Sequence, residues 1–175
     1  MTSQPSTATT IAAALSAAAL LASSLSPALA QAPAAVRTER NISLALANDI
    51  ASATVAACAA NGYAVAATVV DRAGTVRAVQ RADNAGPHTL GASQHKAFTS
   101  ASAKNTTLAM MENAQKNAAA ANLVYIPGFL LVGGGVPIKV GTETIGAVGV
   151  GGAPGGHLDE QCAMTALDKV KDQLK

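Results

Sequence analysis

Aromatic and charged residues are both scarce in this 175-residue chain. It has no tryptophan, two tyrosines and two phenylalanines, and 13% of its residues are charged, with a formal net charge of +2. Proteins that bind nucleic acids need clustered basic residues along the phosphate backbone, often with aromatic side chains on which bases stack. The composition therefore argues against a nucleic-acid partner and against an aromatic cage for a ligand.

The first thirty residues contain no Lys, Arg, Asp or Glu. From Ile11 to Leu25 they consist almost entirely of Ala, Leu and Ser, and Ala28-Leu29-Ala30 offers the small residues that a signal peptidase accepts. The run is too short and too rich in Ala and Ser for a bilayer-spanning helix, although its positive n-region rests on the amino terminus alone. We therefore predict a cleaved signal peptide over residues 1–30.

Cleavage would leave a periplasmic or secreted protein that is not an integral membrane protein. The remaining residues have the length of one domain. Residues 31–41 carry Pro33 and several polar residues, which predicts a flexible leader before a single domain over 42–175.

Cysteine occurs at two positions, Cys58 and Cys162. In the oxidising compartment of an exported protein the two can remain joined. Such a bridge closes a long loop and contributes roughly 4 kcal/mol in the chain-entropy model. Two separately buried, small apolar thiols are an equally good interpretation, so the sequence leaves the pairing open.

Turn residues and hydrophobic periodicity predict an α+β domain. Ser43 is a suitable N-cap for a first helix that ends at Asn61-Gly62, and Asp71-Arg72-Ala73-Gly74 separates two strands at hairpin distance. The order of helices and strands lacks the regular βαβ alternation of a doubly wound sheet. We expect a mainly antiparallel five-stranded sheet flanked by helices. The expected strands are 64–70, 76–80, 130–132, 137–140 and 144–150; further helices are expected within 89–121, with a break near 102–106, and at 158–174.

Several familiar catalytic and phosphate-binding patterns fail on inspection. Ser93-Gln94-His95-Lys96 has the Ser-x-x-Lys spacing of penicillin-recognising enzymes, but their Ser-Asp-Asn and Lys-Thr-Gly companions are absent, so we interpret it as coincidence. The glycine clusters near Gly133 and over 149–156 match neither G-x-G-x-x-G nor the P-loop, and they predict turns. No G-x-S-x-G elbow is present, which removes the usual signal of an α/β-hydrolase.

Three histidines, His88, His95 and His157, are candidate metal ligands. His88 and His95 would lie roughly 10 Å apart along a helix axis, too far to share one zinc ion unless the first lies off the helix. Haem iron needs only one or two axial ligands, and Gly86-Pro87 place His88 and Thr89 at a predicted helix N-terminus whose N–H groups can hold a carboxylate. A hydrogen-bonded surface or capping histidine is the structural alternative.

The segment from Arg81 to Thr89, followed by Ala92-Ser93 and Lys96-Ala97-Phe98-Thr99, resembles the central signature of the GlcG/HbpS-like haem-binding family, also called haem-degrading. The 71–74 turn is similar to the family's D-x-x-G turn, and 133–137 to its GG-x-P segment. Residues 145–154 are similar to its IGA-hydrophobic-GV-x-GA-P strand and loop. These matches keep the expected order over nearly the whole chain beyond residue 43.

The resemblance implies a profilin-like domain that forms a homo-oligomer and takes haem or another small anionic ligand as its partner. It implies a ligand site around His88 and Thr89, with His88 favoured as the iron ligand and Lys96 as a partner for a haem propionate. His95 and His157 depart from the family pattern; the alternatives are that one of them is a second ligand or that neither is. The expected cofactor-binding residues are Gly86, Pro87, His88, Thr89, His95 and Lys96.

Three functions remain in view. The first is an exported haem-binding protein involved in sequestration, sensing or breakdown of haem, which we expect. The second is an enzyme or accessory protein that acts on a small organic acid, with Arg81 and Lys96 among its polar groups; a general base beside a nucleophile would favour it, and the sequence displays none. The third is a non-catalytic oligomeric scaffold or sensor-partner module. Whether the protein is an enzyme stays open.

Overall fold

The structure is a computed structural model that describes residues 1–2 and 35–175. One compact unit runs from Thr38 to Lys175. The predicted signal peptide, apart from its first two residues, and the start of the predicted leader lie outside the described residues. None of the helices in residues 35–175 is long and apolar enough to cross a membrane.

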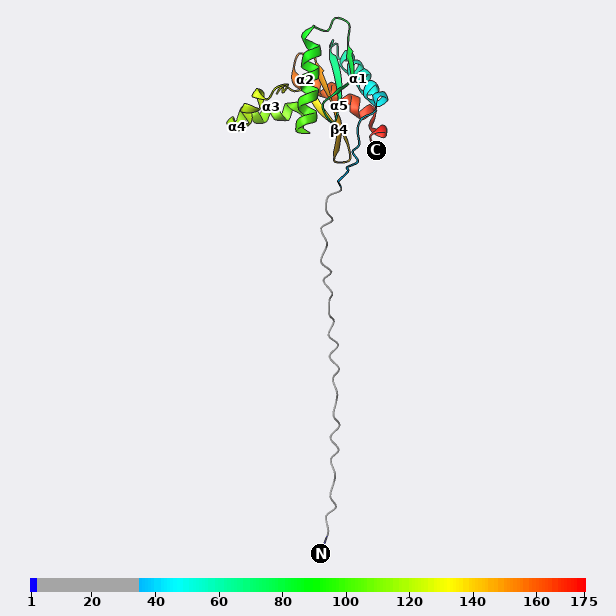
Figure 1. Ribbon diagram of the computed structural model, residues 1–175, viewed down its shortest axis with the longest axis vertical. Helices are drawn as coiled ribbons and strands as arrows, with labels where there is room; N and C mark the ends of the chain where they lie inside the picture. Colours follow the sequence, from blue (N-terminus) through cyan, green and yellow to red (C-terminus); the bar gives the residue numbers. More distant parts are fainter. Residues whose placement is uncertain (3–34) are drawn as a thin grey trace. The chain divides into compact units, whose positions relative to one another are not determined.

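The elements confirm an α+β domain (Figure 1). Ser43 caps the first helix as predicted, because its hydroxyl accepts the Leu46 N–H at 3.2 Å. The predicted break after the second helix is present, with Lys104 in the left-handed conformation at its C-cap. The order is α1 (Leu44–Ala59), β1 (Ala66–Asp71), β2 (Val76–Arg81), α2 (His88–Ala103), α3 (Thr107–Lys116), α4 (Ala118–Ala121), η1 (Asn122–Tyr125), β3 (Gly135–Val140), β4 (Glu143–Gly151), α5 (Gly156–Lys169) and η2 (Lys171–Gln173).

The sheet is antiparallel throughout, with strand order β2-β1-β4-β3. Helix α2 packs on one face, where Val70 and Ala147 meet Ala97. Helices α1 and α5 pack against each other and against the opposite face, where the larger core cluster includes Ile50 and Val148. Pro137 lies in β3, one of the two edge strands, where its missing N–H is tolerated.

The strand predicted at 130–132 is wrong, and the sheet in the described part of the chain has four strands. The backbone of this segment is satisfied by helix side chains and not by a neighbouring strand. The Leu130 N–H donates to the Thr99 hydroxyl at 2.8 Å, and the Thr107 hydroxyl donates to the Val132 carbonyl at 2.7 Å. These bonds hold the segment against α2 and α3 as an irregular strap.

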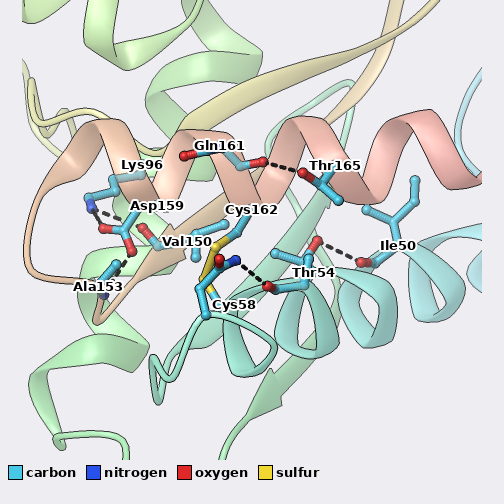
Figure 2. The surroundings of a disulfide bond; sticks show 12 residues. Ile50, Thr54, Cys58, Lys96, Val150, Ala153, Asp159, Gln161, Cys162 and Thr165 are labelled. Carbon is cyan, nitrogen blue, oxygen red and sulfur yellow. Dashed lines mark hydrogen bonds and ion pairs between the residues drawn. A yellow bond between two sulfur atoms is a disulfide. The ribbon is translucent and has the colours of Figure 1, made fainter.

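The disulfide joins Cys58 at the end of α1 to Cys162 in α5, with their Cα atoms 5.3 Å apart (Figure 2). Both cysteines are buried in the larger core cluster. Of the two interpretations that the sequence leaves open, the bridge is the one present, and it ties together the two helices on that face of the sheet.

The end of the predicted leader is anchored to the domain by charged groups. The Arg40 guanidinium donates to one oxygen of Glu143 at 2.7 Å, and Arg72 donates to the other at 2.8 Å. These two bonds lower the pKa of Glu143 to about 2. The Ile42 N–H also bonds the Ile145 carbonyl at 3.1 Å, so Thr38 and the residues that follow belong to the compact unit.

Helix α2 approaches β4 closely because the contact residues are small. A Cβ added at Gly149 would overlap the Ser93 carbonyl oxygen and the Ala97 backbone nitrogen. We expect Gly149→Ala to lower the free energy of unfolding by about 1–3 kcal/mol, the usual cost of overpacking. Urea unfolding followed by circular dichroism measures this loss.

Gly91, which lies in α2 itself, provides a control for the substitution in β4. A Cβ added there would meet nothing within 4 Å, and replacing a glycine inside a helix by alanine stabilises it by about 0.5–1 kcal/mol. Gly91→Ala should therefore raise the unfolding midpoint while Gly149→Ala lowers it. Equal effects of the two substitutions would contradict the close packing of α2 on β4.

Candidate functional site

A cavity of about 360 Å³ lies where α2, the 130–132 strap and the turn between β4 and α5 meet. Its volume falls in the range of small-molecule sites. Its apolar side chains are those of Ala92, Leu130, Val132, Ala153 and Pro154. The β4–α5 turn, 151–156, supplies mainly glycine backbone, and His88, Lys96 and Asp159 supply the polar side chains.

The lining of the cavity includes a buried ion pair between Lys96 and Asp159, drawn in Figure 2. Lys96 Nζ lies 2.8 Å from Asp159 Oδ2 and donates to the Val150 carbonyl at 2.9 Å. The other oxygen of Asp159 accepts the Ala153 N–H at 3.0 Å. Lys96 and Asp159 are only 4% and 3% exposed, so the pair joins α2, the end of β4 and α5 through groups that are almost entirely removed from water.

Burial raises the pKa of the Asp159 carboxyl above its ordinary value. The Lys96 ammonium and the Ala153 N–H oppose this effect, because both stabilise the charged carboxylate. Asp159 is therefore a carboxyl whose charge depends on its one cationic neighbour. A change in the partners of Lys96 would change the proton affinity of Asp159.

Gly134 makes room for this pair. Its φ is +119°, a conformation that side chains rarely adopt. A Cβ added there would lie 2.7 Å from Asp159 Cβ and 3.1 Å from Lys96 Nζ. The close approach of the backbone to the ion pair therefore requires glycine at position 134, which explains part of the GG-x-P pattern seen in the sequence.

His88 begins α2 and lines the cavity with an exposed side chain. Its ring lies back over Gly86, because a Cβ added at Gly86 would sit 2.7 Å from ring carbon Cε1. The absence of a side chain at position 86 thus permits this orientation of the imidazole. An exposed ring at the rim of the cavity is available to a ligand.

The other residues predicted for the site lie elsewhere. Thr89 is buried, and its hydroxyl donates to the Gly86 carbonyl at 2.7 Å. His95 is exposed and, like Gly86 and Pro87, is not part of the cavity lining. The ring of His157 is exposed and lies against Gly155, outside the lining. The structure therefore brings His88 and Lys96 to one cavity, and none of the other four predicted residues.

The Ser-x-x-Lys spacing does not form a catalytic pair. The Ser93 hydroxyl lies 2.8 Å from that of Thr68 and donates to the Leu90 carbonyl at 2.9 Å, while Lys96 bonds Val150 and Asp159. Ser93 is fully buried on the side of α2 that faces Thr68 of β1. The serine and the lysine therefore use separate partners, as the interpretation of coincidence requires.

Sequence reasoning missed Asp159, the strap and the cavity-lining role of the β4–α5 turn. One signal could have found Asp159: a lysine on the inner face of a helix needs a buried partner, and Asp159 is the acidic residue in the first turn of α5. The strap gave no such signal, because its partners are hydroxyls on two other helices.

The fold is a small α+β domain with a cavity of about 360 Å³ beside its second helix. The chain belongs to the HbpS-like family, because the family model described as haem degrading protein HbpS-like matches residues 42–168. This confirms the family resemblance stated from the sequence.

Solved structures agree with this assignment. The chain is 36% identical to a double mutant of Streptomyces reticuli HbpS, covering 81% of this chain and 98% of that one with a TM-score of 0.71. It is 30% identical to Klebsiella pneumoniae protein ORFY, covering 77% and 94% with a TM-score of 0.73. The crystal structure of a PduOC:heme complex shares the fold at 22% identity, with coverage of 73% and 94% and a TM-score of 0.67.

Proposed function

We propose that this chain is an exported haem-binding protein, with the haem seated at the cavity and His88 as its axial ligand. The family description and the haem complex of a structural relative support haem as the ligand. The observation that carries the proposal is the exposed imidazole of His88 at the rim of a cavity that also holds apolar side chains and the Lys96 ammonium.

The chemistry of these groups fits haem. Imidazole is a common axial ligand of haem iron, and apolar side chains such as Leu130 and Val132 suit the macrocycle. Lys96 supplies an N–H donor for a propionate. A bound haem would supply an iron centre whose reduction potential depends on its axial ligand and surroundings. The chain's own contribution is to hold the His88 ring over Gly86 and to place Leu130 and Val132 at the same cavity.

Haemin titration of the mature protein tests the iron ligand. We expect a Soret shift on binding, and in His88→Ala we expect affinity to fall by about tenfold or more with a changed Soret position, because the iron loses its axial nitrogen. His95→Ala is the matched control, since His95 lies seven residues further along α2, is exposed and is outside the cavity. It should bind haemin like the unchanged protein.

Two results would contradict the proposal. No Soret shift in the unchanged protein removes haem as the ligand. A loss in His95→Ala with none in His88→Ala places the iron at the other histidine. The homo-oligomer expected from the family stays a prediction, which light scattering coupled to size-exclusion chromatography measures.

Export is supported by the uncharged, Ala-rich segment before residue 31 and by the Cys58–Cys162 disulfide, since disulfides persist mainly in oxidising compartments. Mass spectrometry of the protein recovered from its own cells should give a mature chain that begins at Gln31. A protein recovered with Met1 or Thr2 at its amino terminus and with reduced cysteines would contradict export.

A further inference from the structure

The cavity holds few charges. Its lining contains one lysine, one aspartate and one histidine, namely Lys96, Asp159 and His88. The β4–α5 turn and the strap contain no ionisable side chain. The ion pair has no net charge, so a ligand carboxylate would bring an uncompensated negative charge into a partly enclosed site, where such charges are costly.

The hydrogen bonds of the ion pair leave one N–H of Lys96 for a ligand. The positive charge of Lys96 is already balanced by Asp159. A lysine ammonium has three N–H groups, and Lys96 directs two of them to Asp159 and Val150. In the described part of the chain its third N–H donates to no protein acceptor, and Lys96 lines the cavity. Both oxygens of Asp159 are used, by Lys96 and by the Ala153 N–H (Figure 2).

We propose that the Lys96–Asp159 pair couples ligand binding to proton uptake: a carboxylate of the ligand bonds Lys96, and Asp159 takes one proton from solvent. This rests on the proposed function, in which a haem propionate is that carboxylate. The charges balance, because the neutral pair, one carboxylate and one proton again sum to zero. No other bond forms or breaks. The protonated carboxyl keeps an acceptor for the Ala153 N–H and gains an O–H donor.

The surroundings of Asp159 support this assignment. Burial already raises the pKa of Asp159, and sharing Lys96 with a second carboxylate weakens the main influence that opposes it. The other ionisable groups near Asp159 are His88, which lines the same cavity, and His157 and Glu160, its neighbours on α5. Burial also raises the pKa of Glu160, which bonds Leu108, Thr106 and Gly134. The ring of His157 lies against Gly155, a residue of the lining, while His157 itself is not part of the lining.

His88 is an ionisable side chain that lines the same cavity, so the experiment must separate its contribution from that of Asp159. Metal-free protoporphyrin IX removes iron ligation from the measurement, and its dimethyl ester removes the carboxylates while keeping the ring. Fluorescence titrations between pH 6 and 8 should show that the acid binds up to about tenfold more tightly for each unit that the pH falls, as uptake of one proton requires. The ester should show no such slope.

Two variants assign the proton. Asp159→Asn keeps the side-chain volume and an acceptor for Ala153, and we expect it to abolish the slope for the acid. His88→Ala should leave the slope for the acid in place, because the metal-free porphyrin has no iron for His88 to bind. Calorimetry of the unchanged protein in two buffers of different ionisation enthalpy should give about one proton taken up per porphyrin, which needs no variant.

Each outcome decides the inference. Equal slopes for acid and ester, or a slope that disappears in His88→Ala and persists in Asp159→Asn, would overturn it. If haemin and protoporphyrin IX both bind without proton uptake, this inference fails while the proposed function stands. If neither binds, both fail.

Discussion

Replacing Cys58 and Cys162 together with alanine is expected to lower the free energy of unfolding by about 4–5 kcal/mol at 25 °C. The bridge spans a sequence separation of 104 residues, and closing a loop of that length removes much of the entropy of the unfolded chain. The packing lost with two buried sulfur atoms adds to this effect. Denaturant unfolding of the disulfide-bonded unchanged protein and of the double variant measures the difference.

Reduction provides the control for this prediction. A reductant should lower the stability of the unchanged protein toward that of the variant and should leave the variant unaffected. A difference below about 1 kcal/mol between the two proteins would show that the bridge constrains the unfolded chain much less than its loop length implies.

Replacing Lys96 with methionine is expected to cost about 3–5 kcal/mol, because Asp159 would remain buried without its cation. Burial raises the pKa of Asp159 above its value in the unfolded chain. The folded variant therefore binds a proton more tightly than the unfolded one, and its stability recovers as the pH falls through the folded pKa toward the unfolded value. Urea unfolding at pH 7 and pH 5 measures both effects.

Two further variants show whether the stability lost in Lys96→Met comes from the unpaired, buried carboxylate of Asp159. Lys96→Met combined with Asp159→Leu should recover most of the lost stability, since it removes both charges. Lys171→Met breaks an exposed pair with Asp168 and should cost less than about 1 kcal/mol. A double variant as unstable as Lys96→Met would contradict the stranded carboxylate and point to lost packing of the lysine stem.

Local signals predicted most of the fold. The Ser43 cap and the turn ending in Gly74 depend on residues close in sequence, so the sequence alone indicates them. The error at 130–132 has a different origin. A short apolar run is typical of a strand, but here Thr99 and Thr107, more than twenty residues away, take over its backbone hydrogen bonds.

The residues that line the cavity were predicted only in part, because some of them lie far apart in the sequence. His88 and Lys96 fall within one continuous sequence signature, whereas Asp159 lies 63 residues beyond Lys96. The sequence gives no measure of the distance between them, which depends on how α2 and α5 pack around the end of β4. The disulfide stayed open on the same ground, because only the packing of α1 against α5 brings its two cysteines into range.

Both edge strands of the sheet, β2 and β3, carry residues that disfavour pairing with a strand of another molecule. Edge strands expose unpaired backbone groups that invite pairing with another chain. Here β3 carries Pro137, which lacks an N–H, beside the exposed Lys139, and β2 carries the exposed Arg77 and Arg81. These side chains oppose the growth of the sheet from one molecule into the next, so the domain is protected against strand-to-strand aggregation.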